Sequence, residues 1–494
     1  MVPPLAMTHH TMLTREIDEG PAGPHVGAFF DLDRTLIAGF SATSFVRDWL
    51  TSGRAEVADV AAATAAAIAF QLGRKNFSAF VSESLAMVKG LTEEEFAAVG
   101  ERVFGASIAA DIFPEARALV DAHRARGHSL AVISSATRSQ VEPVARELGI
   151  DRVFCTELEV KDGRLTGEII RPACYGQGKA DAAARFADER GVDLDESYFY
   201  TDSDEDLPLL LAVGRPRPIN PTRRLQSIAA KRVWPVRSFT SRGVPSATDV
   251  VRTSLSIASV VPSFLLGLPT AFLDGDFRAA VNLAATTWGE LGTALAGIHV
   301  TVEGEQHLWS QRPAVFVFNH QSAIDPLLVC KLLRRDFVGI SKQEVRDYPI
   351  LGQAFELAGT IFIDRFNRTE AIKALEPAID ALGRGLSIAI APEGTRSLGP
   401  RLGHFKKGAF RIAMAAGVPV VPIVIHNALD ALPKHGMIIR PASVEVTVLP
   451  PVPTSDWSHD DLDARIASIR QDFRHTLGLT EDDDQPARGR WAKA

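Results

Sequence analysis

The sequence predicts an α/β protein in which an N-terminal doubly wound parallel sheet with a helical cap is joined to a C-terminal α/β unit. Short apolar runs alternate with helical stretches in the first half of the chain, and the alternation returns in the second half. A stretch without charged residues separates the halves. With 494 residues, 46% of them hydrophobic, the chain is long enough for two cores.

The first unit is expected over residues 26–238. Its buried parallel strands are predicted from three apolar runs, Val26–Phe30, Ser129–Ile133 and Tyr198–Thr201. Between the first two runs, about residues 40–112 contain good helix formers and little strand character, notably in Ala55–Phe70 and Phe77–Ile112. We therefore expect a helical cap inserted after the first strand.

The second unit is expected over residues 298–480. Its predicted strands lie near Ala314–Phe318, Gly359–Ile363, Leu386–Ala391 and Val418–Ile425. We expect disorder at residues 1–25, which are rich in proline without an apolar period, and at residues 481–494, an acidic run followed by basic residues. The first 25 residues also lack the apolar core of a secretory signal, and three cysteines without metal-ligand spacing suit a reducing compartment.

The joint, residues 239–297, combines basic and apolar character. Thr253–Leu273 has no charged residue and is long enough to span a bilayer, but Pro262 and Pro269 should kink or break such a helix. Upstream, residues 215–252 hold nine Arg or Lys against one acid, Asp249. We expect these features to bind an anionic membrane surface, peripherally or monotopically, at the cytoplasmic face of the cell membrane. The alternative is a buried helical hairpin.

The first chemical motif runs from Phe29 to Leu36, an apolar strand followed by two alternate carboxylates. Asp31, at the strand end, is positioned to attack phosphorus and form an aspartyl-phosphate. Asp33, two residues on, is positioned to protonate the leaving oxygen and later to activate water. The pair indicates hydrolysis of a phosphate ester.

Three further elements follow in order. Ser134, after an apolar run, is suited to hold a phosphoryl oxygen, and Lys179 is suited to neutralise its charge. The acidic stretch 200–206, with Asp202 and Asp206, supplies the oxygen ligands that Mg²⁺ prefers. This ordered set resembles the haloacid dehalogenase superfamily, in particular its phosphoserine-phosphatase-like branch with a helical cap.

The resemblance covers about residues 26–238. It implies that Mg²⁺ is bound by Asp31, Asp202 and the backbone carbonyl of Asp33, with Asp206 supporting the site. One position departs from the family. Phosphoserine-specific members carry a Glu nine positions after the nucleophile to hold the ammonium of the substrate, and this chain has Phe40 there. We therefore expect a leaving group without an amine, or a more apolar one.

The second chemical motif runs from Asn319 to Asp325. His320 follows a predicted strand, where an imidazole, which titrates near neutral pH, is suited to take a proton from an alcohol. Asp325 is suited to fix the imidazole tautomer. A spacing of five is poor for one helix face, so we expect His320 on a turn and Asp325 at the helix start, as an N-cap before Pro326.

Asn319 to Asp325 resembles the NHxxxxD motif of the glycerolipid acyltransferases, the lysophosphatidic acid acyltransferase family. Three later blocks are similar to that family in the same order: Gly359–Arg365, Pro392–Ser397 and Val418–Ile423. The resemblance covers about residues 298–450. It implies that His320 and Asp325 are the catalytic pair. It also implies a phosphate and substrate site, whose residues are Arg365, Glu393, Gly394, Thr395 and Arg396.

Together these motifs predict an enzyme of two activities. The C-terminal half is expected to acylate a lysophospholipid, 1-acylglycerol-3-phosphate, from acyl-CoA or acyl carrier protein, giving phosphatidate. The N-terminal half is expected to be a Mg²⁺-dependent phosphatase. Two alternatives stay open: a catalytically idle phosphatase-like domain that regulates or scaffolds the acyltransferase, and a different lipid acceptor. We expect no nucleic-acid partner, and the sequence leaves the oligomeric state open.

Overall fold

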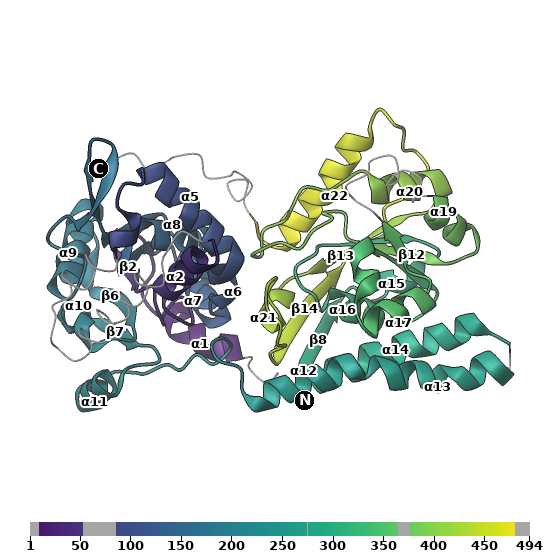
Figure 1. Cartoon of the computed structure of the whole chain (residues 1–494), viewed down its shortest axis with the longest axis horizontal. Coiled ribbons are helices and arrows are strands. Elements are labelled where there is room, and N and C mark those ends of the chain that lie inside the picture. The colour runs from purple at the N-terminus through teal and green to yellow at the C-terminus, as the bar shows by residue number, and fades with distance from the viewer. Residues whose placement is uncertain (1–8, 53–84, 274, 364–375, 480–494) are drawn as a thin grey trace. The chain divides into compact units, whose positions relative to one another are not determined.

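The computed structural model shows two α/β units (Figure 1). The structure describes residues 9–52, 85–273, 275–363 and 376–479. The chain divides into Met1–Val244 and Pro245–Ala494, and each unit is treated by itself. Both contain a sheet with helices packed on it, which confirms the predicted fold class.

Unit 1 is built on a five-stranded parallel sheet in the order β3-β2-β1-β6-β7. Its strands are β1 (Val26–Phe30), β2 (Ser129–Thr137), β3 (Arg152–Thr156), β6 (Asp193–Thr201) and β7 (Arg215–Pro218). All three predicted strands are therefore confirmed. Neighbouring residues of β1 point to opposite faces, and both faces are buried: Phe29 packs against Phe186, whereas Phe30 stacks on Tyr200.

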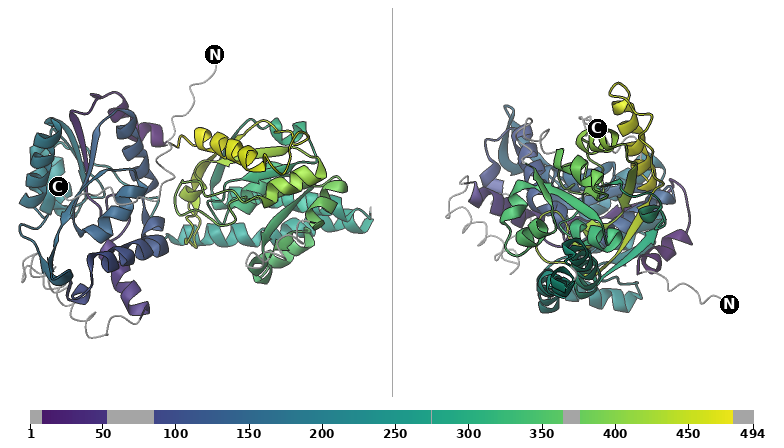
Figure 2. Two further views of the ribbon diagram at one scale, coloured as in Figure 1. Left: turned by 90° about the horizontal axis from the view of Figure 1, so that it is seen from above. Right: turned by 90° about the vertical axis from the view of Figure 1, so that its right-hand side faces the viewer.

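Helices cover both faces of this sheet (Figures 1 and 2). They are α1 (His9–Asp18), α7 (Pro114–Ala125), α8 (Arg138–Glu147), α9 (Gln177–Arg190), α10 (Leu207–Ala212) and α11 (Arg223–Arg232). A separate two-stranded hairpin pairs β4 (Leu158–Lys161) with β5 (Arg164–Ile169).

The region expected as a cap is helical where the structure describes it. It contains α2 (Ser41–Thr51), the 3₁₀ turn η1 (Leu85–Val88), α5 (Glu93–Val103), the π-helical turn η2 (Phe104–Ile108) and α6 (Ala109–Asp111). Arg102 of α5 forms a bidentate ion pair with Asp48 of α2. Ala55–Phe70, and the part of Phe77–Ile112 before residue 85, lie outside the described residues.

The N-terminal segment differs from the expected disorder. Residues 9–18 form α1, whose Leu13 and Ile17 are buried in the core of unit 1. These residues are four positions apart and therefore share one helix face. This helical spacing was not predicted because prolines lie on both sides of the segment. Glu16 of α1 forms ion pairs with Arg217 and Arg237. Two cations of the basic stretch 215–252 are therefore bonded within unit 1 rather than free to meet lipid.

Unit 2 contains a seven-stranded sheet in the order β11-β10-β12-β9-β13-β14-β8. The β13–β14 pair is antiparallel, and the other neighbouring pairs of this sheet are parallel. Its strands are β8 (Ile298–Glu303), β9 (Val315–Phe318), β10 (Phe337–Lys342), β11 (Ile361–Ile363), β12 (Ser387–Ile390), β13 (Val420–Ile425) and β14 (Ala442–Val448). The helices and 3₁₀ turn between them are α15 (His307–Ser310), α16 (Asp325–Leu333), η4 (Gln343–Asp347), α17 (Leu351–Leu357), α19 (Glu376–Gly383), α20 (Gly408–Ala416), α21 (Ala428–Ala431) and α22 (Leu462–Thr476).

Three consecutive helices precede this sheet: α12 (Ala247–Ala258), α13 (Val260–Leu273) and α14 (Phe277–Ala296). Pro269 lies inside α13 and Pro262 in its first turn, so the prolines are accommodated and the only interruption is at Ser259. In Figure 1, α14 runs back along α13 and α12. At Gly289 the backbone of α14 meets α16, because a Cβ there would lie 2.4 Å from the backbone nitrogen of Lys331.

Two candidate active sites

Lys179 joins two carboxylates of unit 1 in a buried network. Its Nζ is 2.9 Å from Asp31 Oδ1 and 2.8 Å from Asp206 Oδ2. None of the three residues is more than 6% exposed. Burial raises the pKa of Asp31, and the charge of Lys179, the next largest influence, only partly opposes this rise. Burial alone would lower the pKa of Lys179, but the two carboxylates raise it, so the lysine is held as a cation.

Parallel pairing brings the other predicted residues to the same edge of the sheet. Asp31 follows β1, Asp202 follows β6 and Ser134 lies near the end of β2, and β1 lies between the other two strands. Thr201 donates a 2.6 Å hydrogen bond to Asp206 Oδ2 and so fixes the second partner of Lys179. Ser134 is 1% exposed, and its Oγ accepts a hydrogen bond from the backbone of Ala136.

Asp33 lies where the sheet meets the cap. Its Oδ1 accepts a 2.7 Å hydrogen bond from the backbone nitrogen of Ser41, the first residue of α2. Burial raises the pKa of Asp33, and the bonds from Ser41 act against it. The carboxylate is therefore held at the cap side of the site, on the same strand extension as Asp31.

Asp202 forms an ion pair with Arg34, with 3.0 Å between Oδ2 and Nη1. Burial, and next the charge of Asp31, raise the pKa of Asp202 to about 7. Asp31 and Asp202 thus place like charges in one buried site, which favours an added cation.

This donor set fits Mg²⁺. Within the described ranges, no three His, Cys, Asp or Glu side chains form a metal-binding group. The arrangement instead offers two carboxylates, Asp31 and Asp202, beside the backbone of Asp33. Because Mg²⁺ keeps several waters and commonly takes one or two carboxylates from a protein, two such side chains suffice.

In unit 2, His320 and Asp325 lie on the turn between β9 and α16. His320 Nδ1 is 2.7 Å from Asp325 Oδ2, and this oxygen also accepts from the backbone nitrogens of Gln321 and Ser322. Asp325 is fully buried, whereas the side chain of His320 is 23% exposed. The bond to Nδ1 leaves Nε2 of the imidazole for a substrate.

The expected position of these residues holds in part. His320 is on the turn and α16 begins at Asp325 with Pro326 behind it, but the N-cap residue is Ile324. Asp325 points back into the turn instead of capping the helix, because its Oδ2 is used by His320 and the two backbone nitrogens. Asn319, which we had not assigned a role, bonds through both side-chain atoms to the backbone of Ile425 and ties the turn to β13.

Glu393 has a different environment from the predicted phosphate site. Its Oε1 accepts a 2.8 Å hydrogen bond from the nitrogen of His320, and Oε2 accepts a 2.6 Å bond from the nitrogen of Gly403. Burial raises its pKa, and these bonds oppose the shift. Glu393 therefore holds the His320 turn against a second loop, and a carboxylate used in this way is unsuited to meet a phosphate.

Three of the remaining predicted residues belong to the loop that follows Glu393. Ser397 donates a 2.8 Å hydrogen bond from its nitrogen to the carbonyl of His320, which brings Thr395 and Arg396 beside the histidine. Gly394 has φ +75°, and a Cβ there would lie 2.8 Å from Lys406 Nζ. Arg365 lies outside the described residues.

Comparison with known proteins separates the same two regions. Residues 28–211 match the family model of haloacid dehalogenase-like hydrolases, and residues 299–426 match the acyltransferase family model. A probable phosphatase of Mycobacterium tuberculosis is 33% identical over 238 residues, 46% of this chain and 82% of that protein. A 1-acyl-sn-glycerol-3-phosphate acyltransferase of Limnanthes alba is 36% identical over 201 residues, 40% of this chain and 71% of that protein.

Among solved structures, the 1-acyl-sn-glycerophosphate acyltransferase of Thermotoga maritima is 24% identical, with a TM-score of 0.40, and the match covers 47% of this chain and 98% of that chain. The sequence matches confirm both family resemblances. The chain therefore belongs to the haloacid dehalogenase-like hydrolases through its first unit and to the acyltransferases through its second, and it is an acyltransferase with a phosphatase domain.

Proposed function

We propose that unit 2 transfers an acyl group from acyl-CoA or acyl carrier protein to 1-acylglycerol-3-phosphate, giving phosphatidate for phospholipid synthesis. The observation that carries the proposal is the His320–Asp325 pair, in which the buried carboxylate binds Nδ1 and leaves Nε2 for the acceptor. The name of the Limnanthes relative supports the choice of acceptor.

The geometry suits base-catalysed acyl transfer. Nε2 of His320 takes the proton of the acceptor hydroxyl while that oxygen attacks the thioester carbon. The imidazolium is stabilised by Asp325. The carbon–sulfur bond then breaks, and the proton passes from His320 to the departing thiolate. Glu393 positions the histidine through its backbone nitrogen.

Unit 1 is proposed to hydrolyse a phosphate monoester. Asp31 attacks phosphorus to form an aspartyl-phosphate, and Asp33 protonates the leaving oxygen and then activates water. Lys179 and Ser134 hold the phosphoryl oxygens. Mg²⁺, held by Asp31, Asp202 and the Asp33 carbonyl, would supply positive charge that offsets the phosphoryl oxygens. The buried, charged state of Lys179 supports activity over an idle domain, because an unused buried ion network is costly to keep.

The leaving group of this hydrolysis is proposed to be glycerol-based. Phe40 is 54% exposed, just before α2, and the Arg34 guanidinium lies 5.9 Å from its ring centroid. An exposed ring next to an arginine offers an apolar surface and no carboxylate for an ammonium group. We therefore expect lysophosphatidate, phosphatidate or glycerol phosphate to be hydrolysed faster than phosphoserine.

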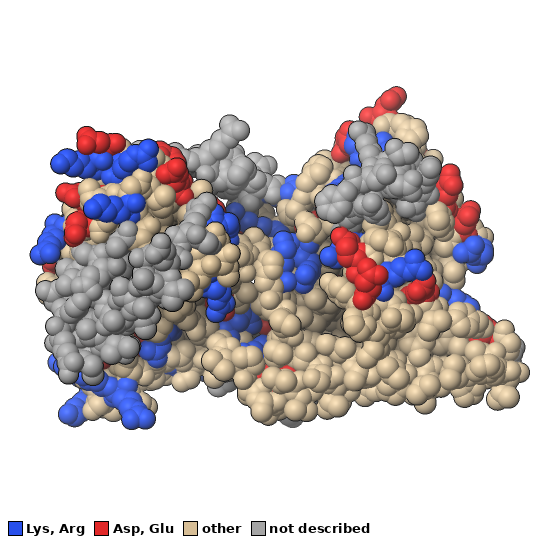
Figure 3. Space-filling model, in the orientation of Figure 1, with Lys and Arg blue, Asp and Glu red and all other residues tan. Residues whose placement is uncertain are grey.

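The helices α12 to α14 are proposed to bind the cytoplasmic face of the cell membrane. By length and composition, the helical stretch Ala247–Leu273, made of α12 and α13, could cross a bilayer, and it is one such stretch in the described part of the chain. It exposes many large apolar side chains, including Leu265, Leu266 and Phe272. Figure 3 shows a surface over these helices with few charges. A patch of this kind is typical of contact with lipid.

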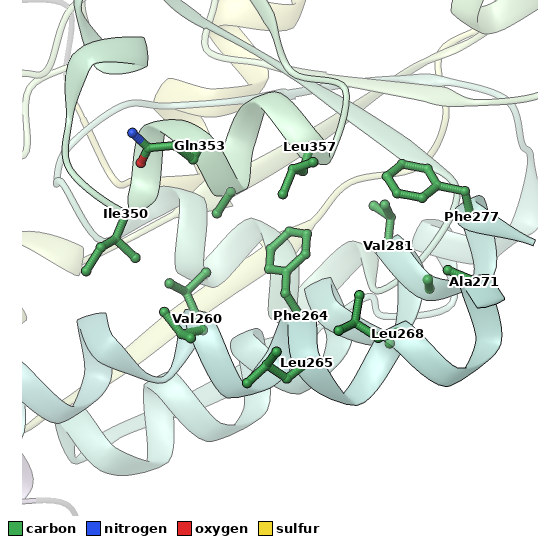
Figure 4. Close-up of a pocket in the computed structure, with 14 residues that line it drawn as sticks. Val260, Phe264, Leu265, Leu268, Ala271, Phe277, Val281, Ile350, Gln353 and Leu357 are labelled. Atoms are coloured by element: carbon green, nitrogen blue, oxygen red, sulfur yellow. The ribbon is translucent and has the colours of Figure 1, made fainter.

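The same helices border an apolar pocket of about 400 Å³. Figure 4 shows Phe264 and Leu268 of α13 facing Leu357 of α17 and Val281 of α14 across it. Apolar side chains thus continue from the exposed face of the hairpin to the side of unit 2 that carries α17, which supports a membrane-bound arrangement over a buried hairpin.

Two assays test the proposal. The purified chain is offered acyl-CoA with a panel of lipid and sugar acceptors, and the products are identified by mass spectrometry. Faster acylation of another acceptor than of 1-acylglycerol-3-phosphate would overturn the acceptor assignment. Hydrolysis of an aryl phosphate is measured with and without Mg²⁺, and its absence under both conditions would favour the regulatory alternative.

A further inference from the structure

A segment of unit 2 that belongs to none of the predicted motifs runs beside the catalytic turn. It begins at Leu432, after α21, and Ser322 of the turn donates a buried 2.6 Å hydrogen bond to the Leu432 carbonyl. The nitrogen of Gly436 then bonds to the carbonyl of Pro433 at 2.9 Å, closing a tight turn. Lys434 and His435 are the two residues inside that turn, so both lie close to the loop that carries His320.

Arg396 approaches the same place from the other side. The next residue, Ser397, is bonded to the His320 carbonyl. The charge of Arg396 acts on both residues inside the turn. Burial, followed by Arg396, lowers the pKa of Lys434. Burial, followed by Lys434 and Arg396, lowers the pKa of His435. Two loops that are bonded to the His320 turn thus carry three basic side chains.

These basic side chains are not compensated by acids. Among the described residues, Arg396, Lys434 and His435 form no ion pair with a carboxylate, whereas Arg440, a few residues along the same segment, is paired with Asp249 at 2.7 Å. Basic side chains that repel one another without an acidic neighbour favour an added anion.

The segment is fixed at both ends. Leu432 is held by Ser322, and at the other end Arg440 binds Asp249 and the nitrogen of Ile439 bonds to Thr253 Oγ1 at 2.9 Å. Asp249 and Thr253 belong to α12. Because the turn lies between two anchors, its backbone is positioned before any ligand arrives, which lowers the entropic cost of binding.

We propose that Lys434 and His435 join Arg396 in a binding site for a phosphate monoester next to His320, and that this site takes the phosphate of the acyl acceptor. The inference rests on the proposed function and adds residues to it. In 1-acylglycerol-3-phosphate the reacting hydroxyl is only a few bonds from the phosphate, so a phosphate site beside the base suits the acceptor. The phosphates of acyl-CoA lie at the far end of a long arm from the thioester. Lys434 supplies a point charge, and His435 a ring N–H donor.

Steady-state kinetics of the full chain test the site with Lys434→Ala, His435→Ala and the charge-conserving Lys434→Arg. Arg384→Ala, which removes an exposed cation from a turn elsewhere in unit 2, is the matched control. For 1-acylglycerol-3-phosphate, we expect Lys434→Ala to raise KM about tenfold with little change in kcat, as loss of one charged contact to phosphate predicts. Lys434→Arg should restore most of the affinity, and KM for uncharged monoacylglycerol should not change.

The outcomes separate the alternatives. An increased KM for acyl-CoA with an unchanged KM for the acceptor would assign the cations to the donor and overturn the proposal. Equal losses with both acceptors would indicate a structural role and also overturn it. If the wild-type chain does not acylate 1-acylglycerol-3-phosphate, the proposed function fails. The site is then judged by calorimetric binding of inorganic phosphate without Mg²⁺, which must be weaker in Lys434→Ala than in Arg384→Ala.

Discussion

The two proposed catalytic centres of this chain differ in how they expose their reactive groups. In unit 1, Asp31 and Lys179 are 6% and 2% exposed, and the nucleophile is held within a network of buried charges. In unit 2, Asp325 is fully buried, but His320 in front of it keeps about a quarter of its side chain in solvent. The first centre thus encloses its proposed nucleophile, Asp31, whereas the second leaves its proposed base, His320, partly exposed to solvent.

They also differ in how their cations are paired, although both are proposed to handle phosphate esters. Among the described residues, the first centre contains four carboxylates and two cations: Asp31, Asp33, Asp202, Asp206, Lys179 and Arg34. Within the same described ranges, Arg396 and Lys434 of the second centre form no ion pair with a carboxylate, and its carboxylates Asp325 and Glu393 bond to the His320 turn instead. A centre whose cations are already paired with carboxylates gains from an added metal ion before it holds a phosphate, whereas cations without such pairs are suited to bind phosphate directly.

The largest expected effect comes from the nucleophile of unit 1. Asp31→Asn should lower phosphatase turnover by about 10⁵-fold or more, because a neutral amide does not attack phosphorus. Acyl transfer should be unchanged, since the centres share no residue. Rates with an aryl phosphate and with the lipid acceptor check this, with the exposed Asp188→Asn as control. Substantial hydrolysis by Asp31→Asn would remove the aspartyl-phosphate route.

The base of unit 2 should give the next largest effect. His320→Ala should slow acyl transfer by about 10²- to 10⁴-fold and leave Mg²⁺-dependent hydrolysis intact. The exposed His299→Ala is the control and should be active. Wild-type acylation by His320→Ala would show that another group takes the proton, and the contrast between the two centres would fail.

Removing the buried cation should cost more stability than removing an exposed one. Lys179→Met leaves Asp31 and Asp206 unpaired in the core and should lower the free energy of unfolding by about 3–5 kcal/mol. Lys331→Met breaks a more exposed pair with Glu290 and should cost less than about 1 kcal/mol. Urea denaturation measures both. Equal losses would mean that burial does not distinguish the two pairs.

The apolar surface of unit 2 can be tested at one side chain. Phe272, which is 80% exposed in α13, should contribute about 1–2 kcal/mol to vesicle binding, so Phe272→Gln should weaken binding roughly tenfold. Ile170→Gln, which changes an exposed residue of unit 1, should not affect it. Sedimentation with anionic vesicles measures the affinity, which should also fall with added salt. Unaltered binding by Phe272→Gln would argue against lipid contact at α13.

The smallest expected effect is the pH dependence of the stability of unit 1. Burial lowers the pKa of His123, which bonds to His128 and Tyr200 in unit 1. Below the unfolded pKa of about 6.5, the unfolded chain gains a proton that the folded chain resists, so stability falls as pH decreases. Between pH 6.5 and 5.5, His123 should contribute a loss of about 1 kcal/mol. Urea unfolding of wild type and His123→Leu should differ in pH slope, and parallel slopes would contradict this.

Sequence patterns predicted the central strands because buried parallel strands are apolar throughout. Val26–Phe30 is an example, and both of its faces are covered. β7 could not be predicted: Arg215–Pro218 alternates two arginines and two prolines, which an edge strand tolerates but no strand pattern contains.

The candidate sites also contain residues that the sequence predicted and residues that it could not predict. His320 and Asp325 lie within one short motif, so the family resemblance paired them although their spacing of five does not suit one helix face. Lys434 joins the proposed site through the fold, where Ser322 bonds to Leu432, 110 positions away. Its neighbours in sequence carry no chemical pattern, and only the folded chain brings it to the base.

The bond between Arg440 and Asp249 has a practical consequence for dividing this protein. Asp249 accepts from Ser246 at the start of α12 and also binds Arg440, so it connects the hairpin to the segment that carries Lys434. A fragment that starts at Ile298, where the sheet of unit 2 begins, would contain every residue of the NHxxxxD motif and still lose this anchor. An independently expressed acyltransferase should therefore start before Ser246.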